Sequence, residues 1–136
     1  MKIKYYNRGK SKYHNIKART SEGLEFDSRK ELRRWKELSM LQSLGEIEDL
    51  QRQVEFELIP AQYETEIRIS DKTGKRLKDK MVLKERRCCY IADFVYKDKG
   101  GNTIVEDTKS EATRTPEYII KRKLMRYLKG INVTEI

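Results

Sequence analysis

Apolar residues spaced three and four apart predict a first amphipathic helix that begins at Phe26-Asp27-Ser28 and runs to Gly45. Its expected buried face is Leu32, Trp35, Leu38, Leu41 and Leu44. Ser28 and Glu31 fit the S-x-x-E capping box, in which the two side chains bind free amides of the first turn. Helix capping alone is therefore enough to explain why Glu31 stands at this position.

Alternating apolar residues predict a strand over residues 52–59, which ends at Pro60. Residues 90–109 predict a β-hairpin that reverses at Gly100-Gly101. The last six residues, 131–136, alternate and predict a short closing strand.

A second helix is predicted to begin at Thr115-Pro116 and to stop at Gly130. Its expected buried stripe is Ile120, Leu124, Tyr127 and Leu128. Lys121, Arg122, Met125 and Arg126 are expected to point away from that stripe or along its edge.

Residues 62–87 contain a turn signal, Asp-Lys-Thr-Gly, among mostly charged residues, and predict an exposed hairpin or a mobile insertion. The remaining order is helix, strand, strand, strand, helix, strand. We expect a single α/β (α+β) domain over residues 1–136, with a basic insertion after the first core strand.

Composition adds a polyanionic partner to this picture. The chain has 31 Lys and Arg against 22 Asp and Glu, a net charge of +9, so nucleic acid is the first candidate for a binding partner. The alternative is that the positive charge only keeps the protein soluble. The charge is concentrated in three segments, residues 1–21, 72–87 and 109–129.

The basic N-terminal arm, residues 1–21, has tyrosines between its cations, as expected of a segment that lies on phosphates and stacks on bases. A disordered tail is the alternative. The nucleic-acid contacts predicted here and in the second helix are Lys10, Lys12, Tyr13, Lys17, Arg19, Lys121 and Arg122.

No apolar run approaches the roughly 18 residues that span a bilayer, and no signal-peptide core follows the first basic residues. We therefore expect a cytoplasmic protein with no membrane partner. Cys88 and Cys89 are adjacent, which suits neither a zinc clip nor a structural disulfide, so we expect reduced strand residues.

The predicted hairpin over residues 90–109 has charged side chains among apolar ones. Residues two apart share a face of a strand, so Asp93 and Asp107 can meet on one face, with Lys109 beside Asp107. Two carboxylates there repel each other and are costly to desolvate, unless a cation lies between them. Glu106 falls on the opposite face.

Hard oxygen ligands favour Mg²⁺ or Mn²⁺, and Mg²⁺ commonly uses one or two carboxylates, waters and a substrate phosphate. Lys109 could then orient the attacking water or stabilise charge on a scissile phosphate. A solvated two-stranded ribbon with an Asp/Lys cross-strand pair is the structural alternative.

Asp93 followed by Asp107-Thr108-Lys109 resembles the PD-(D/E)XK nuclease signature. Further stretches are similar to a small phage and prophage family, domain of unknown function 1064, which is assigned to that superfamily: KYHN at 12–15, FDSRKE at 26–31, FELIPAQ at 56–62, YIADFVY at 90–96 and VEDTK at 105–109. The resemblance implies a restriction-endonuclease-like αβββαβ core, with a mixed central sheet flanked by helices.

The resemblance also implies a ligand set. Asp93, Asp107 and the backbone carbonyl of Thr108 would hold the metal, with Glu31 as a further ligand that competes with its capping role. Gln53 is a weaker candidate for contacting phosphate or metal-bound water. Ala92 stands where the motif's name has proline, a position that varies in the superfamily.

The expected function is a Mg²⁺-dependent DNA endonuclease with catalytic residues Asp93, Asp107, Lys109 and Glu31. Small phage enzymes of this superfamily include Holliday-junction resolvases, which act as dimers, so branched or duplex DNA, a homodimer and a bacterial host cytoplasm are expectations. The alternative is a nucleic-acid-binding or regulatory protein that keeps the fold without cleaving.

Overall fold

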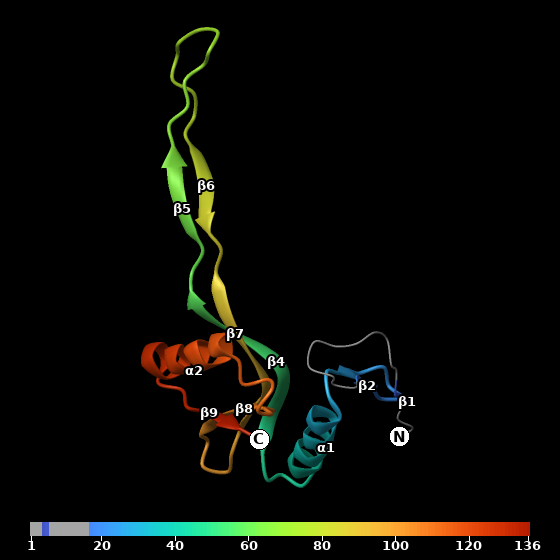
Figure 1. The fold of residues 1–136 in the computed structure, drawn as a ribbon. Coiled ribbons are helices and arrows are strands. Elements are labelled where there is room, and N and C mark those ends of the chain that lie inside the picture. Colours follow the sequence, from blue (N-terminus) through green and yellow to red (C-terminus); the bar gives the residue numbers. More distant parts are fainter. Residues whose placement is uncertain (1–3, 6–16) are drawn as a thin grey trace.

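The computed structural model describes residues 17–136 together with the backbone of Lys4 and Tyr5 (Figure 1). Its central sheet has the strand order β4-β7-β8-β9, with β9 parallel to β8 and the other pairs antiparallel. The strands are β4 (Glu48–Ile59), β7 (Cys88–Lys97), β8 (Thr103–Asp107) and β9 (Val133–Glu135). With helices α1 (Arg29–Ser43) and α2 (Pro116–Lys129), the fold is mixed α/β, as predicted.

Helix α1 begins where the sequence places its cap. Ser28 Oγ accepts a hydrogen bond from the Glu31 amide at 3.1 Å, and Glu31 Oε2 accepts one from the Asp27 amide at 3.1 Å. Leu32 and Leu38 are buried, as expected. The prediction for Leu44 is wrong: this residue is the C-cap, beyond the last buried turn, and is 67% exposed.

Helix α2 has the predicted ends but buries a different face. Thr115 caps it and Gly130 ends it with a left-handed φ of 66°, a conformation that glycine adopts without strain. The predicted stripe is wrong at three of its four positions, because Ile120, Tyr127 and Leu128 are exposed, whereas Leu124 packs against the core. Tyr118 and Met125 are buried instead, so the prediction that Met125 points away from the buried face is also wrong. Two apolar stripes fit the helical period, and the sheet covers only the one containing Tyr118.

Three apolar clusters form the core of the described residues, and the two larger ones lie one against each helix. In Figure 1 the helices lie on either side of the β4–β7 ribbon. Strand β7 contributes to both of the larger clusters. Tyr90 and Ala92 pack with Tyr118 and Met125 of α2, whereas Phe94 and Tyr96 pack with Leu38 of α1. Asp93 therefore lies where β7 passes from one cluster to the other.

Three short strands form a small separate sheet that the sequence did not predict: β1 (Lys4–Tyr5), β2 (Ala18–Arg19) and β3 (Glu25–Phe26). Ala18 and Phe26 are buried with Leu32 of α1, so residues 17–26 dock on the first helix. Lys10, Lys12 and Tyr13 of the predicted basic arm lie outside the described residues.

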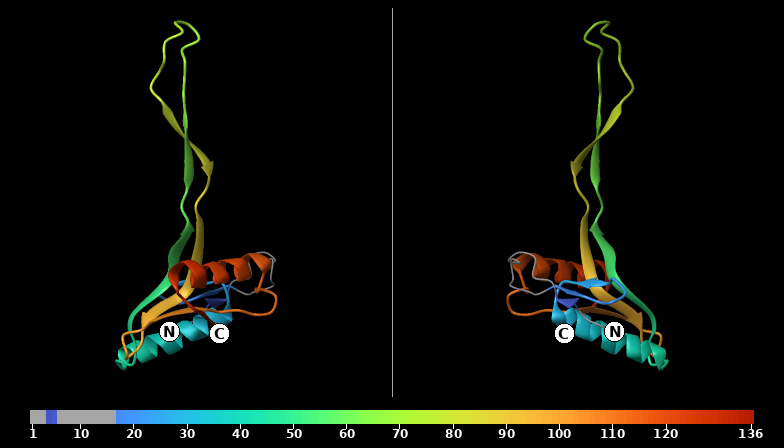
Figure 2. Two further views of the ribbon diagram at one scale, coloured as in Figure 1. Left: turned by 90° about the vertical axis from the view of Figure 1, so that its left-hand side faces the viewer. Right: turned by 90° about the vertical axis from the view of Figure 1, so that its right-hand side faces the viewer.

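Residues 60–87 form a long projection that we name the hairpin arm. Strands β5 (Gln62–Glu66) and β6 (Lys80–Glu85) pair with each other in a separate two-stranded sheet, and the arm extends far from the sheet and helices (Figures 1 and 2). The predicted exposed hairpin is confirmed. Ile59 and Cys88 pair at its root, so the arm is an extension of the β4–β7 ladder.

Within the part of the chain that the structure describes, no helix is long and apolar enough to span a membrane. Cys88 and Cys89 have free thiols at the start of β7, in agreement with the prediction of reduced strand residues.

The hairpin arm begins after Ile59 and ends before Cys88, and these two residues pair with each other in the β4–β7 ladder. We therefore predict that the rest of the protein folds without the arm. Replacing residues 60–87 by a short Asn-Gly turn should leave a cooperative unfolding transition, because Ile59 and Cys88 already lie opposite each other. We expect a midpoint within about 5 °C of the wild type, measured by circular dichroism, since shortening a loop changes stability little. Loss of the cooperative transition would show that the arm is part of the folding unit.

Candidate active site

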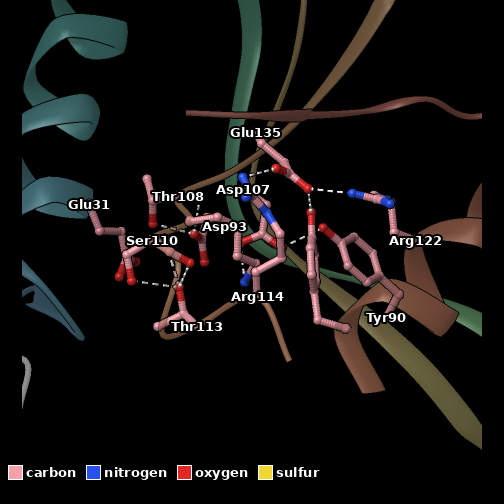
Figure 3. Close-up of polar contacts among 12 residues, drawn as sticks. Glu31, Tyr90, Asp93, Asp107, Thr108, Ser110, Thr113, Arg114, Arg122 and Glu135 are labelled. Atoms are coloured by element: carbon pink, nitrogen blue, oxygen red, sulfur yellow. Dashed lines mark hydrogen bonds and ion pairs between the residues drawn. The ribbon is translucent and has the colours of Figure 1, made fainter. Parts of the chain in front are cut away.

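Four elements bring polar residues into one cleft of about 480 Å³ (Figure 3). Glu31 comes from the first turn of α1, Asp93 from the middle of β7 and Asp107 from the last position of β8. Thr108 and Lys109 follow directly after β8, and all five residues line the cleft. The N-cap residues of both helices, Ser28 and Thr115, also line it.

Asp93 connects the two central strands through its side chain. Its Oδ2 accepts hydrogen bonds from the Thr108 amide at 2.8 Å and from Thr108 Oγ1 at 2.6 Å. Its Oδ1 accepts a longer bond, 3.3 Å, from Gln53 Nε2. One carboxylate oxygen is thus fully engaged, whereas the other is available for a stronger ligand.

Asp107 is buried, with 2% of its surface exposed. Its Oδ2 accepts a hydrogen bond from the Tyr90 hydroxyl at 2.5 Å, and its Oδ1 lies 2.9 Å from Lys109 Nζ. Burial and the nearby charge of Asp93 raise the pKa of Asp107 to about 6, although Tyr90 and Lys109 act in the opposite direction.

Glu31 combines the capping role with a place beside the acids. Its Oε2 accepts the Asp27 amide, while its Oε1 accepts Gln53 Nε2 at 3.3 Å. Burial, and secondarily the charge of Asp93, raise the pKa of Glu31 to about 7. Glu31 therefore caps the helix through Oε2 and faces the other acids through Oε1, so the two roles are compatible.

Gln53 joins two of the acids through a strained backbone position. Its φ is 49°, in the left-handed region that residues other than glycine seldom adopt. Its side-chain nitrogen, Nε2, lies 3.3 Å from Glu31 Oε1 and 3.3 Å from Asp93 Oδ1. The predicted contact residue is thus placed inside the cluster by an irregularity of β4.

Lys109 is fixed at both its backbone and its side chain. Its amide donates to the Ile136 carbonyl at 3.0 Å, and its carbonyl accepts Lys30 Nζ at 2.8 Å. Its ammonium lies 4.3 Å from the ring centroid of Tyr118, as well as beside Asp107. Contacts from β9, α1 and α2 therefore set the position of this cation.

Glu106 has partners away from the cleft, as the period of the strand predicts. Arg34 of α1 forms two hydrogen bonds to its carboxylate, at 2.9 and 2.7 Å, and the Tyr96 hydroxyl donates a third. The carboxylate bonds also raise the pKa of Arg34 above its usual range. Glu106 is therefore fully used in joining β8 to α1.

The carboxylates of Asp93 and Asp107 fit a divalent cation that needs only one or two protein carboxylates. Among the described residues, no three His, Cys, Asp or Glu side chains are grouped closely enough to hold an ion by themselves. Two carboxylates with waters and a substrate phosphate suffice for Mg²⁺. The pKa values of Glu31 and Asp107 are raised by the same two causes, burial first and the nearby charge of Asp93 second.

The predicted nucleic-acid contacts are only partly brought together. Lys17 and Lys121 line the cleft, although each has an acidic neighbour, Asp27 at 3.7 Å and Glu117 at 3.1 Å respectively. Arg19 lies 3.7 Å from Glu25 in the small sheet. Arg122 is 2.7 Å from Glu135, which also accepts hydrogen bonds from Arg114 and Tyr118 (Figure 3).

Three residues of the site escaped sequence reasoning: Tyr90, Tyr118 and Lys30. The signal for Tyr90 was present, because a tyrosine buried in a strand needs a partner for its hydroxyl. Burial and the bond to Asp107 raise the pKa of Tyr90 well above its usual value, so it remains a hydrogen-bond donor. Contacts of Tyr118 and Lys30 depend on how the helices dock, which no local pattern specifies.

Comparison with known proteins gives one result. The model of a protein family described as "Protein of unknown function (DUF1064)" matches residues 10–134. No curated protein and no solved structure matches the chain.

The crowded acids predict that metal-free protein loses stability as pH rises. Glu31 has a higher pKa folded than unfolded, so the folded state holds more protons between about pH 4 and 7, and the free energy of unfolding falls across that range. Glu31→Gln keeps the capping acceptor but removes this charge. In EDTA at pH 8 it should be more stable than wild type by on the order of 2 kcal/mol, and near pH 4 the gain should vanish.

Thermal unfolding at the two pH values measures this difference, and Glu37→Gln on the exposed side of α1 is the matched control, expected to change stability by less than about 1 kcal/mol. A Glu31→Gln protein that is less stable than wild type at pH 8 would contradict the account.

Proposed function

We propose that this chain, which belongs to the protein family of unknown function DUF1064, is a divalent-metal-dependent DNA endonuclease. The observation that carries the proposal is the convergence of Asp93, Asp107 and Lys109 in one open cleft, where burial and mutual repulsion raise the pKa of Asp107. Such perturbed acids beside a fixed cation are typical of sites that act on phosphate.

The fold supports a place in the PD-(D/E)XK nuclease superfamily. The order α1, β4, β7, β8, α2, β9 equals the αβββαβ order that the sequence resemblance implies. Asp93 lies in the second strand of this series and Asp107 at the end of the third. The mixed sheet with a helix on either side supports the restriction-endonuclease-like arrangement that the resemblance implies.

Asp93 and Asp107 would hold Mg²⁺ or Mn²⁺, with the Thr108 carbonyl as a further ligand. Glu31 would become a ligand only once a bound ion drew its side chain toward the two Asp carboxylates. When bound, the ion would polarise a scissile phosphate and lower the pKa of a water. Asp93 can turn its Oδ1 to a ligand at little cost, because that oxygen has only the 3.3 Å bond from Gln53. Thr108 meanwhile keeps Oδ2 fixed.

The chain's other residues position the reacting groups. Tyr90 binds one oxygen of Asp107 and so directs the other toward Lys109 and the cleft. Lys109 is held by Asp107 and Tyr118, close enough to donate hydrogen bonds to a phosphate oxygen or to an attacking water that enters the cleft. Gln53 sets the spacing of Glu31 and Asp93.

The substrate class follows from charge and from the resemblance. Lys17 and Lys121 at the cleft suit a phosphate backbone. We propose branched DNA, such as a four-way junction, and duplex DNA as the substrates of this activity. A homodimer would be the form that cuts two strands.

A non-cleaving nucleic-acid-binding protein is the second candidate, and one observation favours it. Both oxygens of Asp107 have partners within the protein, Tyr90 and Lys109, so the cluster is coherent without any ion. A binding protein with a nuclease-like fold would show this closed arrangement permanently.

The endonuclease proposal predicts metal-dependent cleavage of labelled four-way junction or duplex DNA, resolved on denaturing gels in Mg²⁺, Mn²⁺ or EDTA. Asp93→Asn, Asp107→Asn and Lys109→Ala should each lower the rate at saturating enzyme by on the order of 10²-fold or more, because each removes a ligand or a donor to the developing charge. Glu31→Gln tests the fourth acid in the same assay.

Glu111→Gln is the matched control, since this exposed acid lies near the site in sequence but does not line the cleft. Full activity of Asp107→Asn would overturn the site assignment. Wild-type protein that binds these substrates in Mg²⁺ and Mn²⁺ without cutting any of them would favour the second candidate.

A further inference from the structure

The outer part of the hairpin arm is strongly basic. Over residues 67–80 it has six cations against Asp71 and Asp79: Arg68, Lys72, Lys75, Arg76, Lys78 and Lys80. Arg76 is paired with Asp79, and Arg68 donates to the Lys78 carbonyl, so the arginines stiffen the ribbon. The lysines along it are exposed.

The root of the arm adjoins the cleft. Cys89, Tyr90 and Ile91 line the cleft, and Cys88, the first residue of β7, directly follows the arm in the chain. Asp93 is five residues along the same strand, roughly 17 Å from the root at 3.3 Å per residue. Anything bound across the acids therefore passes close to the base of the arm.

The length of the arm fixes how far its cations reach. From the root at residues 60 and 87 to the turn at Gly74 the chain extends about 13 to 14 residues, or roughly 45 Å. A duplex rises about 3.4 Å per base pair, so this reach corresponds to about 13 base pairs. A two-stranded β-ribbon is also narrow enough to enter the major groove of B-DNA.

We propose that the hairpin arm is a second DNA-binding surface, which holds duplex between about one and two helical turns away from the acids. The inference rests on the proposed function, since it takes the cleft as the place where DNA is cut. Arm and cleft would grip the same duplex at two separated points, so that affinity depends on duplex length beyond the cut site.

The arm has an alternative partner, a second copy of this chain. The register pairs Tyr63 with Leu83 and Thr65 with Met81, so these side chains share one exposed, largely apolar face near the base. The opposite face has the Glu64–Lys84 ion pair. The excess of cations over the outer part repels a second copy and attracts a polyanion, which is why DNA is the occupant that we infer.

Binding of the wild type and of a triple variant, Lys72→Ala with Lys75→Ala and Lys78→Ala, tests the proposal on duplexes of about 12 and about 40 base pairs in EDTA. Fluorescence anisotropy over a series of NaCl concentrations gives the dissociation constants. We expect at least a tenfold loss of affinity on the long duplex and less than a twofold loss on the short one. The salt dependence on the long duplex should become shallower by about two to three released ions.

A triple variant at Lys36, Lys123 and Lys129, all changed to Ala, removes the same charge from exposed positions of α1 and α2 and should change neither constant more than twofold. Equal losses on both duplexes, or no loss on the long one, would overturn the proposal.

The two proposals fail separately. Length-dependent binding that needs the arm lysines, in a protein that never cleaves, would leave the arm as a DNA-binding surface and remove the endonuclease. Cleavage that does not depend on the arm lysines would support the endonuclease and remove the arm as a DNA-binding surface.

Discussion

The concentration of carboxylates at the end of β8 is the constraint on which the rest of the site depends. Asp107 and Glu31 are buried near Asp93, with the ammonium of Lys109 2.9 Å from Asp107 and the guanidinium of Arg52 3.9 Å from Glu31. Burial and mutual repulsion raise the pKa values of Asp107 and Glu31, so the ionised cluster opposes folding when no cation is present. A protein keeps such an arrangement readily where a cation or a substrate uses it.

The scaffold holds these acids in place from several directions. The parallel β8–β9 pairing ties the chain around Asp107 and Lys109 to Ile136, and Lys30 of α1 binds the Lys109 carbonyl. On the far side, Glu106 joins β8 to Arg34 of α1. Because each neighbour of Asp107 is anchored to a different element, the cluster cannot relax by moving apart, and the cost of its charge remains.

The sequence predicted this site well where strand geometry decides it. The period of two placed Asp93 and Asp107 together and Glu106 apart, and the capping box placed Glu31 at the start of α1. Packing of α2 could not be predicted in this way, because the stripes containing Tyr118 and Tyr127 both fit a helix and only the docked sheet distinguishes them. Strands of two residues, such as Ala18–Arg19, leave no periodic pattern. The left-handed φ of Gln53 depends on contacts across β4, β7 and α1, which local sequence does not specify.

Proton release on metal binding tests the central claim, that the acid cluster is a divalent-cation site, most directly. At pH 6 the cluster holds protons because of the raised pKa values of Glu31 and Asp107, and a bound cation must displace them. Calorimetric titration with Mn²⁺ in buffers of different ionisation enthalpy should show release of about one proton at pH 6 and much less at pH 8.5. Mn²⁺ binding without proton release at pH 6, or no binding at either pH, would contradict the account.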